Sequence, residues 1–255
     1  MNGYDVPMPM ESITREAIDT LLTAIESRDL RAVRRALHPE ACWQNVPHPA
    51  AEGREAVIAL LYGILCWSER VQWDVVRASI EGASGSVERI DRFWLKGEEH
   101  AVACHGVFSV DIDTRTVISV RDYVDLGEWR QRVNPVLHAL ASRTSTEVIN
   151  GHLAALQKGV PLEVATYFSL DAIIECAEGK VTGWDAVADY YTALGAQPEL
   201  SALAWEIVEP ADAGEVAVDW RFPSSGEPWV TGRDDYEVCA GRITCLRTTL
   251  PLAGS

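Results

Sequence analysis

The sequence predicts an α+β protein of two tandem domains, each a curved, mostly antiparallel sheet covered by helices. Two observations lead to this prediction. The 255 residues repeat themselves as two copies of one unit, each of about 120 residues and so long enough for a domain. Within each copy, helical patterns come first and strand patterns follow, which is typical of α+β domains. We expect one domain at residues 12–130 and a second at 144–252.

The repeat is visible in three pairs of segments. Residues 16–25 align with residues 147–156, and residues 53–57 align with residues 183–187. Near the end of each copy, Val120-Arg121 aligns with Leu246-Arg247. The order of the matching segments is the same in both halves, so the two copies are expected to share one fold.

Helices are predicted at the start of each copy. In the first copy, apolar residues at spacings of three and four indicate an amphipathic helix: Ala17, Leu21, Leu22 and Ile25. A second helix is expected after Asp29 and a third after Gly53. In the second copy, Thr144 and Glu147 have capping-box spacing, and further helices are expected after Pro161 and Gly183.

Strands follow the helices. A first strand is expected at residues 41–46, or 172–176 in the second copy. Alternating patterns with turn signals between them predict four more strands in the first copy: 71–80, 86–95, 100–110 and 117–124. Residues 126–145 contain Pro135 and show no strong periodicity, so we expect them to connect the two domains.

Charge and composition exclude several classes of protein. The chain has 22 Lys and Arg against 38 Asp and Glu, a net charge of −16, which argues against binding nucleic acid or an anionic membrane. It has no apolar run of membrane-spanning length, and residues 1–10 show no secretory signal. The six cysteines form no CxxC pair, so we expect reduced thiols, a cytoplasmic protein and no metal site.

A curved sheet under helices encloses a pocket lined by every second residue of each strand. Alternation places Trp43 and Asn45 on one face of their strand, and Arg89 and Asp91 on one face of theirs. Asp122 lies on a third strand. If these faces point inward, two carboxylates and one guanidinium meet in an apolar cup, where buried charges are normally paired.

This grouping suits acid–base chemistry, because two carboxyl groups with different pKa values can serve as general base and general acid. Asn45 and Trp43 would hold a water molecule by hydrogen bonds. The alternative is that Arg89 and Asp91 form a surface ion pair, since the neighbouring charged residues alternate with them. The apolar side chains nearby favour the inward orientation.

Several segments together resemble the limonene-1,2-epoxide hydrolase family of the SnoaL-like/NTF2-like superfamily. They are residues 43–57, 88–91, 106–110 and 121–125, and the resemblance covers residues 12–130. It implies an NTF2-like cone, a curved sheet with helices around a deep pocket. We therefore expect two tandem NTF2-like cones, with an apolar small-molecule epoxide as the substrate of the first.

The resemblance also implies roles for single residues. Asp122 matches the general base, which takes a proton from a water molecule that Asn45 also holds. Asp91 matches the general acid, and Arg89 matches the bridge between the two carboxyl groups. The reaction would be one-step hydrolysis without a covalent intermediate, metal or cofactor. The family usually has Tyr at the position of Trp43, and the nearby His48 is expected in a surface loop.

The second copy has Thr248 where the first has Asp122. One interpretation is a degenerate domain kept for packing, and the other is a second site formed by Glu175 and Asp219. The tandem domains are expected to form a pseudo-dimer within one chain, with a homodimer as a further possibility. Two other functions stay open: an epoxide-opening cyclase of polyether or polyketide biosynthesis, in which an internal hydroxyl attacks, and a non-catalytic binder of an apolar ligand.

Overall fold

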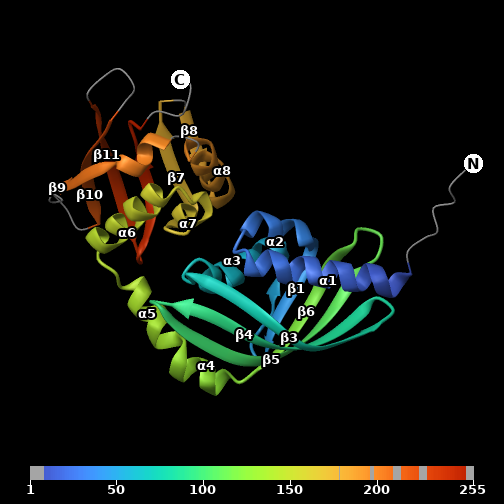
Figure 1. The fold of residues 1–255 in the computed structure, drawn as a ribbon. Helices are drawn as coiled ribbons and strands as arrows, with labels where there is room; N and C mark the ends of the chain where they lie inside the picture. The colour runs from blue at the N-terminus through green and yellow to red at the C-terminus, as the bar shows by residue number, and fades with distance from the viewer. Residues whose placement is uncertain (1–8, 178, 196–197, 209–213, 224–228, 251–255) are drawn as a thin grey trace, which may run out of the picture. The chain divides into compact units, whose positions relative to one another are not determined.

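A computed structural model describes residues 9–177, 179–195, 198–208, 214–223 and 229–250 of the chain. The chain divides into two compact units, Met1–Leu137 and His138–Ser255, and each contains its own six-stranded sheet. Helices precede the main strands in both units. The predicted α+β class with two tandem helix-covered sheets is thus confirmed (Figure 1).

The first unit has its sheet in the order β2-β1-β6-β5-β4-β3. Of its described strands, only β1 and β6 pair in parallel, and the other neighbours are antiparallel. Its elements are α1 (Met10–Glu26), α2 (Leu30–Ala36), β1 (Leu37–Val46), β2 (Ala51–Glu52), α3 (Arg54–Leu65), β3 (Arg70–Glu81), β4 (Ser84–Leu95), β5 (Glu98–Asp111), β6 (Thr116–Val124) and α4 (Leu126–Arg132). The parallel pair brings the end of β1 beside the end of β6.

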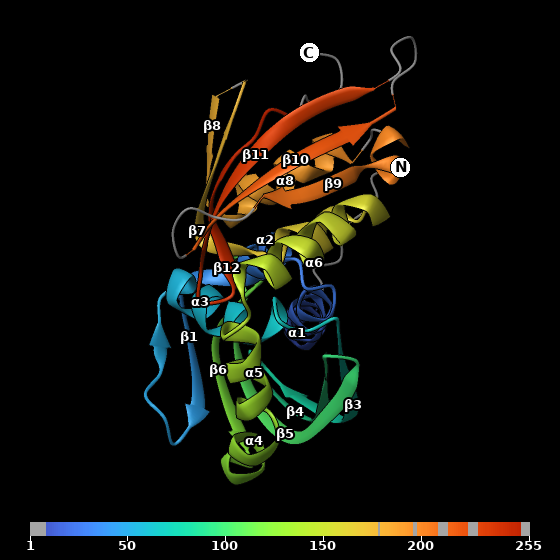
Figure 2. The ribbon, with the colours of Figure 1, turned by 90° about the vertical axis from the view of Figure 1, so that its left-hand side faces the viewer.

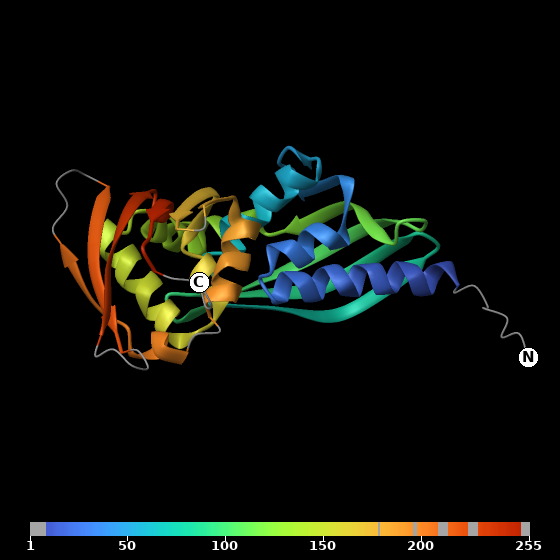
Figure 3. The same ribbon diagram turned by 90° about the horizontal axis from the view of Figure 1, so that it is seen from above.

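The helices of the first unit begin where the sequence signals them. The apolar stripe of α1, including Leu21 and Ile25, is buried, and this helix packs against β3 to β6 (Figure 3). Asp29 caps α2 by accepting hydrogen bonds from the backbone N–H groups of Arg31 and Ala32. Gly53 precedes α3 with a φ of 86°, a conformation that favours glycine.

The segment between the domains differs from the expectation of a connection without periodicity. It forms the helices α4 and α5 (Asn134–Ala141), and α5 runs from the first unit into the second. Asp125 caps α4 by accepting from the N–H groups of Gly127 and Glu128. Pro135 falls in the first turn of α5, where a missing N–H costs no helical hydrogen bond. Helices of seven or eight residues are too short to show an apolar period in the sequence.

The second unit repeats the topology, with its sheet in the order β8-β7-β12-β11-β10-β9 and one parallel pair, β7 with β12. Figure 2 shows this sheet with α6 beside it. Thr144 and Glu147 form the predicted capping box of α6. The elements are α6 (Ser145–Lys158), α7 (Pro161–Ala165), β7 (Phe168–Cys176), β8 (Gly179–Thr182), α8 (Trp184–Leu194), a short 3-10 helix (Pro198–Ala202), β9 (Ala204–Val208), β10 (Glu215–Phe222), β11 (Val230–Cys239) and β12 (Arg242–Arg247).

Candidate active site

Arg89 bridges two carboxyl groups on the inner face of the first sheet. Its Nε donates to Oδ1 of Asp91 at 2.7 Å, and its Nη2 donates to Oδ2 of Asp122 at 3.0 Å. A longer bond of 3.3 Å joins Nη2 to Oδ2 of Asp91. All three residues are buried, and Arg89 is only 1% exposed. The inward orientation of Arg89 and Asp91 is therefore the one that the structure shows.

Gly106 on β5 makes this bridge possible. Arg89 and Asp91 lie on β4 and Asp122 lies on β6, so the guanidinium group crosses β5 to reach Asp122. Gly106 is the register partner of Asp122. A Cβ atom at Gly106 would lie 2.8 Å from Oδ1 of Asp122 and closer still to Nη1 of Arg89. Any larger side chain at this position would occupy the space that the guanidinium group uses.

Trp43 and Asn45 come from β1, the parallel neighbour of β6. Asn45 is the register partner of Asp122, and the indole Nε1 of Trp43 donates to Oδ2 of Asp122 at 3.1 Å. Oδ2 thus accepts from both Trp43 and Arg89, whereas Oδ1 of Asp122 is buried without a hydrogen-bond partner in the described part of the chain. The indole therefore donates a hydrogen bond to the carboxylate directly, and Oδ1 is the oxygen that remains for another donor.

The two carboxyl groups differ in their surroundings. Burial raises the pKa of Asp91 to about 7, and the charge of Asp122 adds to this, although Arg89 opposes it. Burial alone would lower the pKa of Arg89, but the charges of Asp122 and Asp91 outweigh this effect, and the pKa is raised above its usual value. The guanidinium group therefore stays charged, and a substantial share of Asp91 is protonated near neutral pH. Asp122 accepts two N–H bonds on one oxygen, from Trp43 and from Arg89.

A cavity of about 350 Å³ opens onto this group of residues. Its walls include apolar side chains from α3, β4, β6, α4 and α5, whereas His48, Arg130 and Asn134 add polar groups. His48 is exposed, as expected for a loop residue, and it also lines the cavity. The lining residues are Trp43, Asn45, His48, Leu60, Leu61, Gly63, Ile64, Trp73, Asp91, Phe93, Cys104, Asp122, Val124, Leu126, Trp129, Arg130, Asn134 and Leu137.

Sequence reasoning missed three parts of this site. Trp73 on β3 lies under the guanidinium group of Arg89, which is 4.3 Å from the ring centroid. Cys104 on β5 lines the cavity, and the helices α4 and α5 supply Trp129 and Leu137. The alternation of β3 and β5 carries the signal for Trp73 and Cys104. The helices α4 and α5 carry no comparable signal in the sequence, because their residues show no strong periodicity and were expected to form a connection.

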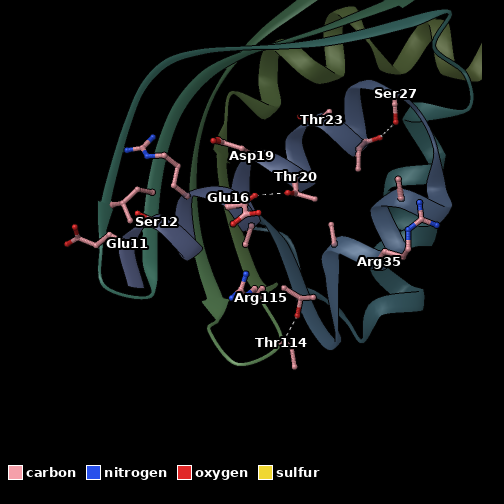
Figure 4. A pocket seen from close by; sticks show the side chains of 17 residues that line it. Glu11, Ser12, Glu16, Asp19, Thr20, Thr23, Ser27, Arg35, Thr114 and Arg115 are labelled. Carbon is pink, nitrogen blue, oxygen red and sulfur yellow. Dashed lines mark hydrogen bonds between the residues drawn. The ribbon is translucent and has the colours of Figure 1, made fainter. Parts of the chain in front are cut away.

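A larger hollow lies elsewhere on the first unit. This open groove of about 1020 Å³ runs along α1 and the turn between β5 and β6 (Figure 4). Side chains such as Glu16, Asp19 and Thr20 face it and are exposed. It contains none of the five predicted site residues of the first domain. Its size therefore does not mark it as the place of the chemistry.

The structure does not bring Glu175 and Asp219 together. Their side chains are 46% and 56% exposed, and they lie on β7 and β10, which are separated by β12 and β11. Glu175 forms an ion pair with Arg247, and Asp219 forms one with Arg233. Both alternate with buried residues of their strands, so they face outward. The geometry therefore does not support a second site formed by this pair.

The inner face of the second sheet carries different residues at the matching positions. Val87 pairs with Gly106 in the first sheet, and Val218 pairs with Asp234 in the second, so Asp234 takes the place of Gly106. Two residues along the strand from Val218, Trp220 replaces Arg89 and donates from Nε1 to Oδ1 of Asp234 at 2.9 Å. Burial raises the pKa of Asp234. The second domain thus replaces the guanidinium bridge with an indole–carboxyl pair.

Metal-binding and membrane-spanning features are not found in the described segments. No group of three His, Cys, Asp or Glu side chains is placed there to hold a metal ion. In the same segments, no helix combines the length and apolarity needed to cross a membrane. No disulfide joins any of the six cysteines, all of which lie in the described segments.

The fold and the site define an α+β cone with a buried arginine between two carboxyl groups. Residues 12–134 match the family described as limonene-1,2-epoxide hydrolase catalytic domain, which confirms the resemblance of the first domain to that family. No curated protein matches the chain.

Among solved structures, an LEH-like epoxide hydrolase from M. tuberculosis is 25% identical, with a TM-score of 0.43 over 52% of this chain and 97% of its own. Bal32a, from a soil-derived mobile gene cassette, is 17% identical, with a TM-score of 0.42 over 48% and 97% of the two chains. A candidate SnoaL-like polyketide cyclase from Jannaschia sp. CCS1 is 19% identical, with a TM-score of 0.44 over 51% and 96%.

Proposed function

We propose that the first domain is an epoxide hydrolase, which opens an apolar small-molecule epoxide by one-step attack of water. The observation that supports this most is the pair of buried carboxyl groups joined by Arg89 at a largely apolar cavity. An epoxide needs a proton on its oxygen and a nucleophile at its carbon; one carboxyl group of such a pair can donate the proton, and the other can activate water as the nucleophile. The family match of residues 12–134 points to the same reaction class.

Asp122 is the general base in this proposal. Its Oδ2 is held by Trp43 and Arg89, so Oδ1 is the oxygen that accepts the proton of the attacking water. Asn45 lines the same cavity beside Asp122 and holds this water through its amide group. The oxygen of the water forms the new bond to one epoxide carbon as the proton passes to Oδ1.

Asp91 is the general acid. Because burial raises its pKa to about 7, it carries a proton near neutral pH and can still release it. The C–O bond breaks as this proton moves to the epoxide oxygen, and the product is a diol inverted at the attacked carbon. The pair ends with Asp122 protonated and Asp91 ionised, and exchange of one proton with cavity water restores the starting state.

The second domain takes no part in this reaction in our proposal. Trp220 stands in place of Arg89 and Thr248 in place of Asp122, so neither the bridge nor the base is kept. Its interior is filled around His152, with the rings of Tyr167, Phe168, Tyr191 and Tyr236 all within 6.2 Å of the imidazole centroid. We propose a packing role for this degenerate copy.

Substitution of each carboxyl group tests the assignment. In Asp91→Asn and Asp122→Asn, we expect turnover of an apolar epoxide to fall by roughly a hundredfold or more, because each removes one proton transfer. Asp113→Asn, an exposed residue of the β5–β6 turn, is the matched control and should keep full activity. Near-full turnover in either site variant would show that the assigned roles are wrong.

A further inference from the structure

Cys104 lies between the two carboxyl groups on the inner face of the sheet. It is the register partner of Arg89 on β4 and of Val124 on β6. Asp91 follows two residues after Arg89, and Asp122 precedes Val124 by two residues. Because residues two apart on a strand share a face, Cys104 is the diagonal neighbour of both carboxyl groups.

The thiol is buried and lines the cavity beside the acid–base pair. Cys104 is 4% exposed, and it is the one cysteine among the described residues that line the cavity. The strand register places this side chain beside both carboxyl groups, and Cys104, Asp91 and Asp122 all line the same cavity. Burial and the neighbouring charge of Asp122 raise the pKa of the thiol, so it remains an S–H donor at neutral pH.

A second observation points to the same place. Oδ1 of Asp122 and the indole Nε1 of Trp73 are both buried in residues that line the cavity, and neither has a partner of normal hydrogen-bond geometry in the described chain. Asp122 and Trp73 are 5% and 7% exposed. Polar groups this well buried are normally satisfied, so this corner of the cavity is arranged for a polar ligand.

We propose that Cys104 is a positioning residue of the acid–base pair, whose thiol donates to Asp91 and stabilises the carboxylate that remains after proton transfer. The role rests on the proposed function for its consequence in catalysis, but the hydrogen bond itself does not. A thiol is small enough to leave room for substrate, and as a neutral donor it adds no charge to the pair. The thiol forms no covalent bond in this role.

Among the described residues, few other charged groups lie near the carboxyl group of Asp91. Arg89 from β4 and Asp122 from β6 face it directly. His48 and Arg130 line the cavity but are exposed, and His100 lies on the inner face of β5 opposite Phe93. The lining residues of α3, which are Leu60, Leu61, Gly63 and Ile64, carry no charge. Substitution of Cys104 leaves all these groups in place, so a change in titration reports on the thiol.

The test is a carbon-13 NMR titration of the Asp91 carboxyl group in the full-length protein, with the signal assigned by its loss in Asp91→Asn. In Cys104→Ala and Cys104→Val, which lack the donor, we expect the titration midpoint of Asp91 to rise by about half a pH unit or more. Cys104→Ser keeps a donor and should hold the midpoint at or below the parent value. Cys66→Ala, a buried thiol that does not line this cavity, is the control and should leave it unchanged.

Two results would overturn the proposal: an unchanged midpoint in both Ala and Val variants, or an equal rise in the Ser variant. If the Ala variant loses its near-UV circular dichroism, its fold is perturbed. The midpoint of Asp91 is then compared between the parent and the Val variant, whose side chain fills the space and suits a strand. The pH profile of kcat/KM should follow the same shifts. If no epoxide is turned over but the midpoint moves as expected, the hydrolase proposal fails and only the hydrogen bond from Cys104 to Asp91 stands.

Discussion

At the scale of single residues, the site depends on two carboxyl groups in unequal surroundings. Among the N–H groups of the described residues, two donate to one oxygen of Asp122, whereas Asp91 accepts only from Arg89 and is buried beside a second acid. A carboxyl group in such a place holds its proton to a higher pH. The proposed division into acid and base rests on these contacts.

The pH dependence of activity follows from the acid. Because Asp91 must be protonated to act and its pKa is about 7, kcat/KM should fall as the pH rises through about 7. The decline should approach tenfold per pH unit at higher pH, where the protonated fraction falls tenfold per unit. Initial rates with an apolar epoxide between pH 5 and pH 9 measure this. A rate that stays level up to pH 9 would contradict Asp91 as the acid.

At the scale of elements, β5 lies between β4 and β6 and leaves room for a side chain of one to reach a side chain of the other. Its inner face presents Cys104 and Gly106 between β4 and β6, and the missing side chain at Gly106 opens the path from Arg89 to Asp122. In the second sheet, Asp234 fills the corresponding place and the bridge is absent. The residue at this position of the central strand is therefore one of several differences that separate the two copies chemically.

Substitution of Gly106 should disrupt the bridge. We expect Gly106→Ala to destabilise the first domain by about 1–3 kcal/mol through overpacking and to lower turnover strongly, because Arg89 and Asp122 must separate. Chemical unfolding and epoxide turnover measure the two effects. Ala103→Ser, on the outer face of the same strand, should change neither. Full activity in Gly106→Ala would show that the close approach is not needed.

The sequence predicted most elements, because repeats, caps and alternation are local signals. It left open which face of β4 points inward, since charged residues occupy both faces and only packing against helices decides. It offered Glu175 with Asp219 as a second site, but aligning the two copies by sequence does not fix the register of β10, in which Trp220 and Phe222 face inward and Asp219 faces outward. A shift of one residue along a strand exchanges its two faces, so a small alignment error reversed the interpretation.

At the scale of the whole molecule, one domain carries the proposed chemistry and the other does not. The net charge of −16 is compatible with an uncharged apolar substrate. The pseudo-dimer of the two domains and a homodimer of the chain stay predictions.

The division of labour between the domains has a direct test. In the double variant Glu175→Gln with Asp219→Asn, we expect epoxide turnover within about twofold of the parent, because both side chains are exposed ion-pair partners on the outer face. Steady-state kinetics of the full-length chain measure this. Loss of turnover comparable to that in Asp91→Asn would show that the second domain contributes to the reaction.

The central claim is that water attacks the epoxide directly at the first domain. The most direct measurement is a single turnover in oxygen-18 water, with enzyme in excess over each of a panel of apolar epoxides, some with an internal hydroxyl group. Mass spectrometry of the product should show a diol labelled with one oxygen-18 atom already in this first turnover, which Asp122→Asn should not form at an appreciable rate. An unlabelled diol would mean that an enzyme carboxylate attacks first, and an unlabelled cyclic ether would mean that a substrate hydroxyl attacks; either result would contradict the account.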